Sequence, residues 1–546
     1  MGKNEKSSVL KQASVLAVAG LIVRMIGLLY RSPMKSIIGS EGAGYYGYAY
    51  NVYTIMLLIS SYSIPMAVSK VMAERIALKE YKNAQKVFKG ALIYVTVVGG
   101  AAALIILTFA KYLLPKGQEN AILALQVLAP TVLLSGYLGV LRGYFQAHRT
   151  MVPTSISQIL EQIFNAIVSV GACWFFTRSV VDSTTQVAIR GAAGGTLGTG
   201  AGVLFGLIFM IFVYFLNSRS IKGHMNKDHT RQEESYKQVF RVLIMMVTPI
   251  IFSTCVYNLS AYVDQTIFSN VLLTKGMEAK EIASQYGIFS LQYMTMINIP
   301  IALASATSST IVPAIAGNYA KGDKTGAKEK IDEGVQFTMF LAIPATIGMG
   351  VLGVPLMRVL FPGNDVVVAG HYLTIGCISI VFYCLSTITN GVLQSISKAM
   401  LPVRNAGISL AINMILLFGM LELYPQMGVL AVILATILYS MCICLLNSLS
   451  IRKHLQYKNQ IKKAYLVPLA ASAAMGVVVW GLNKGISILM PDSYFGNLVS
   501  VGISVLVGII VYILLYLVFS KASPEELKKF PFGTKLLRLA RMLHLR

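Results

Sequence analysis

Three ionisable residues lie inside long apolar stretches of this 546-residue sequence: Arg24, Glu161 and Asp264. An ionisable side chain within a membrane-spanning segment costs about 2.5–3.5 kcal/mol on insertion scales, so it usually faces a protein interior or a water-filled cavity. A guanidinium in such a place can bind phosphate through paired hydrogen bonds, and a carboxylate can bind a cation or a proton. These residues are therefore the first candidates for chemistry.

Arg24 begins a basic series within the first apolar stretch. Arg31 follows seven residues later on the same helical face, and Lys35 continues the series. We interpret the series as a cationic site for an anionic substrate, and an intramembrane ion pair is the structural alternative. Tyr50 lies in the tyrosine-rich stretch that follows, and its ring could stack on a sugar.

Glu161 belongs to a polar stripe in an otherwise apolar stretch. The members recur at helical spacing and share one face of a helix: Ser157, Gln158, Glu161, Gln162 and Asn165. A face of this kind is not expected to contact lipid. We predict that it lines a substrate cavity, and hydrogen bonding between helices explains it equally well.

Asp264 follows Tyr257 and Ser260 on one helical face. A carboxylate beside hydroxyl groups suits Na⁺ or H⁺, so we predict a site that couples transport to one of these cations. No other metal site and no cofactor are expected, because neither the six histidines nor the six cysteines show metal-ligand spacing.

The composition indicates a helical protein with many membrane spans. Hydrophobic residues make up 55% of the chain and charged residues only 12%, whereas a soluble domain has about 25% charged residues. A span needs about 20 apolar residues. Fourteen stretches qualify, at approximately 10–31, 45–67, 89–112, 121–142, 154–177, 191–216, 240–266, 286–312, 335–357, 371–395, 403–422, 427–450, 464–488 and 497–519.

The distribution of basic residues predicts the orientation. With fourteen spans, most of the 46 Lys and Arg residues lie in loops on the side of the N-terminus. Basic loops stay in the cytoplasm, so both termini are predicted to be cytoplasmic. This rule also accounts for the net charge of +24 without nucleic acid as a partner.

A weak internal repeat predicts two lobes. The segment 46-YGYAYNVYTIMLL-58 is similar to 286-YGIFSLQYMTMIN-298, at a spacing of about 240 residues. Two pseudo-symmetric lobes of six helices would then surround a central cavity, with an extra helix pair outside. The predicted parts are an N-lobe (1–217), a cytoplasmic linker (218–239), a C-lobe (240–450), the extra pair (464–519) and a basic amphipathic cytoplasmic tail (520–546).

One motif resembles a known family. The stretch 143-GYFQAHRTMVPTSISQILEQIFNA-166 is similar to the signature of the stage V sporulation protein B-like polysaccharide transporters. These belong to the MOP flippase superfamily, together with lipid II flippases and MATE exporters. The resemblance implies a fourteen-helix, two-lobed, alternating-access transporter of undecaprenyl-linked glycan precursors. The lipid II flippases have a second arginine six residues after the first, whereas Arg31 follows Arg24 by seven, and the polysaccharide transporters often have arginine where this chain has Asn165.

The expected function is that of a flippase for undecaprenyl-pyrophosphate-linked glycan precursors, such as lipid II or a related lipid-linked oligosaccharide. A MATE-like, cation-coupled multidrug exporter is the alternative, although Arg24 would repel a cationic drug. An enzyme is not expected, because no loop is long enough to hold a catalytic domain. We expect a monomer in the bacterial cytoplasmic membrane, with the lipid-linked glycan and membrane lipids as its partners.

Overall fold

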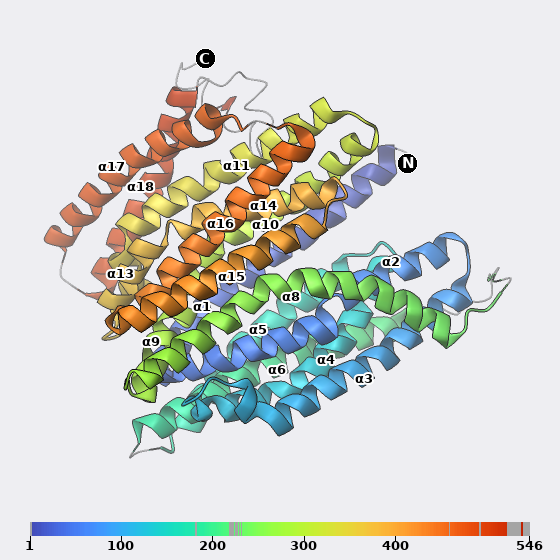
Figure 1. Cartoon of the computed structure of the whole chain (residues 1–546), viewed down its shortest axis with the longest axis horizontal. Coiled ribbons are helices and arrows are strands. Elements are labelled where there is room, and N and C mark those ends of the chain that lie inside the picture. Colours follow the sequence, from blue (N-terminus) through green and yellow to red (C-terminus); the bar gives the residue numbers. More distant parts are fainter. Residues whose placement is uncertain are drawn as a thin grey trace. The chain divides into compact units, whose positions relative to one another are not determined.

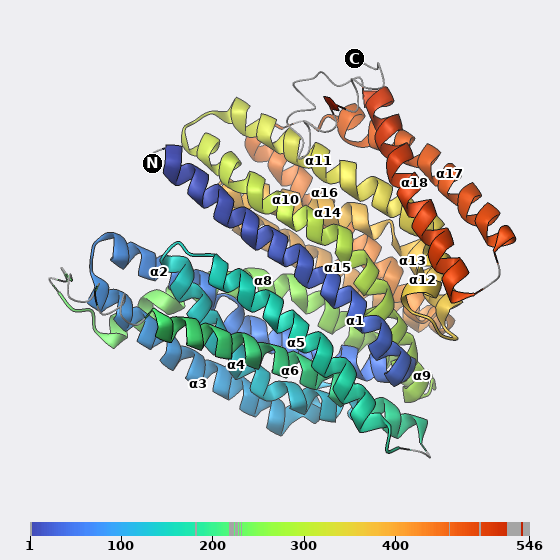
Figure 2. The ribbon, with the colours of Figure 1, turned by 180° about the vertical axis from the view of Figure 1, so that it is seen from behind.

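The computed structural model describes residues 3–180, 183–217, 223, 228, 230, 232–457, 459–490, 493–520 and 537–538. Within these ranges, the side chains of residues 3–18, 21, 249, 252, 253, 256 and 257 are not described. The described residues are almost entirely helical and include no strand (Figure 1, Figure 2). The predicted tail (520–546) lies almost wholly outside them.

Two compact units divide the chain, Met1–Leu291 and Gln292–Arg546. The helices of the first unit are α1 (Lys3–Leu57), η1 (Leu58–Tyr62), α2 (Ile64–Ala77), α3 (Tyr81–Leu113), η2 (Glu119–Ala121), α4 (Ile122–Ala147), α5 (Val152–Thr177), α6 (Thr184–Leu216), α8 (Tyr236–Thr274) and α9 (Ala279–Gly287). α8 and α9 thus group with the N-terminal helices, and the lobe boundary expected from the repeat stays a prediction.

The second unit starts within η3 (Ile288–Tyr293) and is also helical. Its helices are α10 (Met294–Ala320), α11 (Lys324–Val351), α12 (Gly353–Leu360), α13 (Val366–Gly376), α14 (Ser379–Ser395), α15 (Met400–Leu423), η4 (Pro425–Met427), α16 (Val429–Leu455), η5 (Lys462–Leu466), α17 (Val467–Leu489) and α18 (Tyr494–Ser520). α17 and α18 lie side by side next to α11 in both views. The Tyr512 hydroxyl of α18 donates a hydrogen bond to the Phe340 carbonyl of α11 at 2.8 Å, which fastens the extra pair to this unit.

The fourteen predicted stretches all fall in helices or across one short break between helices. Eleven helical stretches of the described part are long and apolar enough to cross a membrane, or twelve if the bent pair α13 and α14 is one span. α8, several of whose side chains are not described, is not among them. The chain is thus a polytopic helical membrane protein, while the count of fourteen spans stays a prediction.

The end of the first predicted span and the whole of the second lie in one helical run, Ile22–Ala77, and α1 itself begins earlier, at Lys3. The 56 residues of the run measure about 84 Å at 1.5 Å per residue, far more than the roughly 30 Å of a hydrocarbon core. Gly39 breaks the run with φ of 68° and ψ of −175°, a conformation that disfavours any residue with a Cβ. The run is therefore long enough for two crossings, joined at Gly39.

The segment before α8 is held by charged groups of α2 and α3. Arg75 forms an ion pair with Glu234 at 2.8 Å, and the Asp228 carboxylate accepts a hydrogen bond from the Lys82 N–H at 3.0 Å. Burial raises the pKa of the Asp228 carboxyl, but the hydrogen bonds from Lys82 and Thr230 outweigh it, so the pKa is lowered overall. This contact therefore stabilises the fold at neutral pH and is lost as the pH falls through the folded-state pKa.

Glycines of α6 allow α5 to approach closely. A Cβ on Gly198 would lie 2.0 Å from the Ser169 hydroxyl oxygen, and a Cβ on Gly202 would lie 2.3 Å from the Glu161 carbonyl oxygen. The glycine-rich stretch that opens the sixth predicted span is therefore a helix-packing surface.

Gly198→Ala should destabilise the protein by about 1–3 kcal/mol, because the new methyl group overpacks the α5–α6 contact. Gly171→Ala is the matched control, since a Cβ at Gly171 of α5 meets no atom within 4 Å. The variants are purified in detergent and heated, and size-exclusion chromatography measures the fraction that stays folded at each temperature. The midpoints of these curves give the difference in stability. Equal midpoints for the two variants would contradict this account of the contact.

Candidate functional site

The polar stripe of α5 contacts three neighbouring helices of the first unit. Arg142 of α4 donates hydrogen bonds to Ser157 Oγ at 3.0 Å and to Glu161 Oε2 at 2.7 Å. The side chains of Arg142 and Glu161 are 15% and 29% exposed, so this ion pair is largely removed from the surface. Asn165 Oδ1 accepts a hydrogen bond from Ser169 at 2.9 Å, at the contact with α6.

Arg142 was not among the residues that the sequence singled out, because it lies next to a basic loop. A signal was nevertheless present. A carboxylate within an apolar helix requires an opposite charge, and Arg142 is the basic residue immediately before the motif that contains Glu161. Hydrogen bonding between helices, the alternative considered for the stripe, thus describes Ser157 and Glu161, whereas the bond that Asn165 accepts from Ser169 lies within α5.

Gln162 turns toward α1 instead. A Cβ on Gly27 would lie 3.3 Å from Gln162 Nε2. Gly27 follows Arg24 by three residues and precedes Arg31 by four, so all three lie on one face of α1. α1 and α5 are far apart in the sequence but pack against each other. The basic series of α1 and the polar stripe of α5 therefore meet at this contact. Gln158 is half-buried on the same stripe.

The basic series becomes progressively buried along α1. The side chain of Arg24 is exposed, that of Arg31 is half-buried and that of Lys35 is only 4% exposed. Arg31 interacts electrostatically with Tyr30, Tyr46 and Tyr50. A guanidinium near tyrosine rings and hydroxyls can bind an anion, and the hydroxyls can bond to polar groups that the anion carries.

Tyr50 lies near both Arg31 and Glu161. Its ring stacks on Tyr46 with centroids 5.6 Å apart and lies at the same distance from Tyr53 in a tilted arrangement. Its hydroxyl lies close enough to Arg31 and Glu161 to feel both charges. The structure thus brings Arg31, Tyr50 and Glu161 into one region of the first unit, which we call the α1–α5 site.

Asp264 lies in a second polar region of the same unit. Asp264 and Ser260 are both 8% exposed, and Asp264 interacts with Tyr286 of α9. Asn51 of α1 donates hydrogen bonds to Gln265 Oε1 at 2.9 Å and to the Tyr286 hydroxyl at 2.7 Å. The side chain of Tyr257, the third predicted member, lies outside the described residues.

Aromatic and hydroxyl contacts hold this second region together. The rings of Tyr48 and Tyr286 stack with centroids 4.4 Å apart, and the Tyr48 and Ser269 hydroxyls are hydrogen-bonded at 2.6 Å. Tyr286 thus joins this network to the Asp264 carboxylate. No group of three or more His, Cys, Asp or Glu side chains that could hold a metal ion occurs in the described part of the chain.

Comparison with known proteins places these features in a family of transporters. The family model for the lipid II flippase MurJ matches residues 84–500. The chain is 27% identical to the lipid II flippase MurJ of Bacillus subtilis (strain 168), over 93% of this chain and 94% of the relative. It is 24% identical to stage V sporulation protein B of the same organism, over 97% of this chain and 99% of the relative.

Solved structures show the same fold. The inward closed conformation of a lipid II flippase MurJ aligns with a TM-score of 0.62 at 16% identity, over 93% of this chain and 98% of that one. An inward-facing MATE family transporter of the MOP superfamily aligns with a TM-score of 0.63 at 15% identity, over 81% of this chain and 98% of the other. The resemblance found in the sequence is confirmed, and these relatives are transporters rather than enzymes.

Arg142 and Glu161 should depend on each other. We expect Arg142→Gln and Glu161→Gln each to destabilise the protein, because each leaves one charge without its partner. The double variant should be less destabilised than the sum, with a coupling energy of about 1–2 kcal/mol. Thermal unfolding of the four proteins measures this cycle, and strictly additive effects would show that the ion pair contributes no coupling.

Proposed function

The chain belongs to the family of the lipid II flippase MurJ, and from this premise we propose that it moves an undecaprenyl-pyrophosphate-linked glycan precursor from the inner to the outer leaflet of the bacterial cytoplasmic membrane. The family match supports the transport of a lipid-linked precursor. The basic series on one face of α1, which packs against the polar stripe of α5, is the observation that supports an anionic substrate.

We assign a role to each part of the α1–α5 site. Arg24, Arg31 and Lys35 bind the pyrophosphate, since a guanidinium donates paired hydrogen bonds to phosphate oxygens. Tyr50 stacks on a sugar ring, and the amides of Gln158, Gln162 and Asn165 bond to sugar hydroxyls. Glu161 holds the Arg142 side chain in place, and its negative charge offsets part of the positive charge of the basic residues. Two lobes that open alternately to either side would carry the bound headgroup across.

We further propose that Asp264 couples this movement to Na⁺ or H⁺. Asp264 lies near the Tyr286 hydroxyl, and Ser260 is one helical turn before Asp264 on α8, so hydroxyl groups accompany the carboxylate. Oxygen ligands are those that a hard cation prefers. The chain acts as a monomer with both termini in the cytoplasm.

A MATE-like exporter of cationic drugs is the second candidate, because MATE transporters share the fold. The charge of the α1–α5 site distinguishes the two functions. A pyrophosphate is attracted to Arg24, Arg31 and Lys35, whereas an organic cation is repelled by them. The sign of the charge therefore favours the flippase.

Arg24→Ala should abolish flipping of the lipid-linked precursor while the protein still inserts into the membrane. Arg24→Lys should also lose most activity, because lysine keeps the charge but not the forked donor geometry. The measurement is the accessibility of lipid II in the outer leaflet of cells that are depleted of the wild-type protein and express the variant. Lys111→Ala, at an exposed lysine in the last turn of α3, is the control and should remain active. Full complementation by Arg24→Ala would refute the cationic site.

Asp264→Asn should bind the substrate but lose the dependence of transport on Na⁺ or H⁺. Asparagine keeps the size of the side chain and removes its charge, so the attraction for a cation is lost. Transport into the outer leaflet of vesicles is measured with imposed Na⁺ and H⁺ gradients. If the variant keeps the ion dependence of the parent, the coupling site lies elsewhere.

A further inference from the structure

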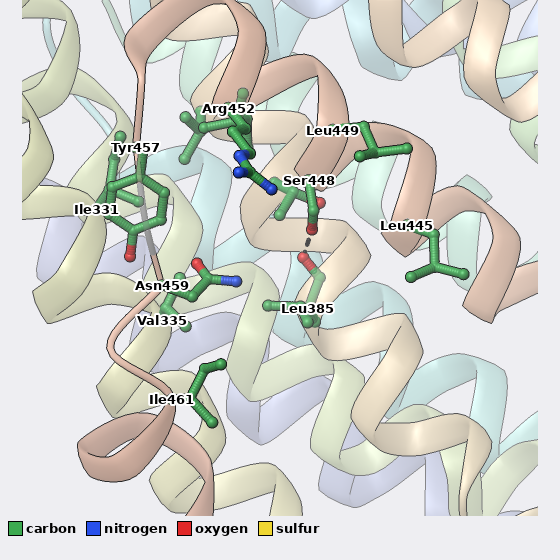
Figure 3. Close-up of a pocket in the computed structure, with 13 residues that line it drawn as sticks. Ile331, Val335, Leu385, Leu445, Ser448, Leu449, Arg452, Tyr457, Asn459 and Ile461 are labelled. Carbon is green, nitrogen blue, oxygen red and sulfur yellow. Dashed lines mark hydrogen bonds between the residues drawn. The ribbon is translucent and has the colours of Figure 1, made fainter.

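A pocket of about 430 Å³ lies in the second unit, between α11, α14, α16 and the segment that follows α16 (Figure 3). Its volume is within the range of about 300–1,000 Å³ that is typical of ligand sites. Aliphatic side chains form most of its wall, among them Val335, Leu385, Leu445 and Leu449. None of the residues that line the pocket belongs to either polar region of the first unit.

The polar parts of the wall are fixed by hydrogen bonds. Tyr457 and Gln460 both donate to the carboxylate of Asp332 on α11, the latter at 2.8 Å, which ties the segment after α16 to this helix. Thr389, on α14, accepts a hydrogen bond from the buried amide of Asn447 at 3.2 Å. The pocket is thus a built feature of the unit, and the nearby carboxylate is already engaged.

Arg452 supplies a cation at one end of the pocket. Its side chain is exposed, and it forms no ion pair or hydrogen bond with other side chains in the part of the chain that the structure describes. Figure 3 shows its guanidinium directed toward the space between Ser448, Tyr457 and Asn459. Lys453, Lys462 and Lys463 add positive charge nearby in the sequence. This end of the pocket is therefore suited to an anion.

The face of α16 has the polarity of a lipid-binding surface. Leu445, Leu449 and Arg452 recur at i, i+4 and i+7, so they form a row along the helix with the charge at its end. Leu445 is 57% and Leu449 is 60% exposed, and the row extends about 10 Å at 1.5 Å per residue. An anionic head at Arg452 would place an apolar chain along the leucines.

We propose that this pocket binds one anionic phospholipid of the bilayer, with its phosphate at Arg452 and an acyl chain along Leu445 and Leu449. Charge complementarity selects the anionic headgroup, because a guanidinium beside phosphate forms charge-assisted hydrogen bonds. The leucine row selects a lipid over free phosphate, which has no apolar part. The bound lipid is a resident of the membrane and not the transported substrate.

The first test compares lipid retention by two neighbouring variants. The full chain is purified with phosphatidylglycerol or with phosphatidylcholine, and the bound lipid is counted by native mass spectrometry. Arg452→Gln should weaken phosphatidylglycerol binding by about tenfold, equivalent to about 1.4 kcal/mol. Lys453→Gln removes the same charge from the adjacent residue, which does not line the pocket, and should bind like the parent. Equal losses in both variants, or equal binding of both lipids by the parent, overturn the proposal.

The second test locates the acyl chain. Ser448→Trp introduces a fluorophore into the pocket wall, and phosphatidylglycerol with brominated chains should quench it in excess of the signal from Trp174 and Trp480 in the parent. Glycerol phosphate, added as a competitor without chains, should not displace the lipid. Displacement by glycerol phosphate, or quenching that is equal for brominated phosphatidylcholine, overturns the proposal. Either failure leaves the proposed substrate site untouched, because that site consists of residues of the first unit.

Discussion

The contact between α5 and α6 is the constraint on which the α1–α5 site depends. Gly198 and Gly202 bring the two helix backbones so close that any side chain would collide with α5. The rotation of α5 about its axis is thereby fixed, because only one face can meet the glycines. Glu161 then faces Arg142 of α4, and Gln162 faces α1. In a membrane, where burial of apolar surface does not drive helices together, small residues provide this close packing.

The apolar character of the chain predicted most of the fold. Continuous apolar stretches leave few alternatives to helices, since a backbone in lipid must satisfy its own hydrogen bonds. Breaks inside helical runs were harder to anticipate. Gly39 interrupts one long run within a segment that the sequence pattern treats as a loop, and only its φ of 68° reveals the position of the break. The grouping of α8 with the N-terminal helices depends on distant contacts, which periodicity does not encode.

The candidate site was predicted in its members but not in its partnerships. Helical spacing places Gln158, Glu161 and Gln162 on one face, as expected from 3.6 residues per turn. It cannot reveal that neighbouring members of this face contact different helices, Glu161 meeting α4 and Gln162 meeting α1. The pairing of Asn51 with Gln265 joins residues more than 200 positions apart. Neither residue carries a charge, so the cost of burial did not draw attention to them.

The two polar regions of the first unit contain ionisable groups of opposite kind, and this difference bears on mechanism. The α1–α5 site has Arg31 next to Tyr50, with Glu161 already engaged by Arg142. The second region has Asp264 near Tyr286, whose hydroxyl accepts a hydrogen bond from Asn51. α1 contributes to both, through Arg31 and Asn51. Arg31 and Asn51 lie on opposite sides of the break at Gly39, so two segments of α1 contribute one group to each region, and a change of angle at Gly39 would alter the spacing between the anionic-substrate site and the carboxylate.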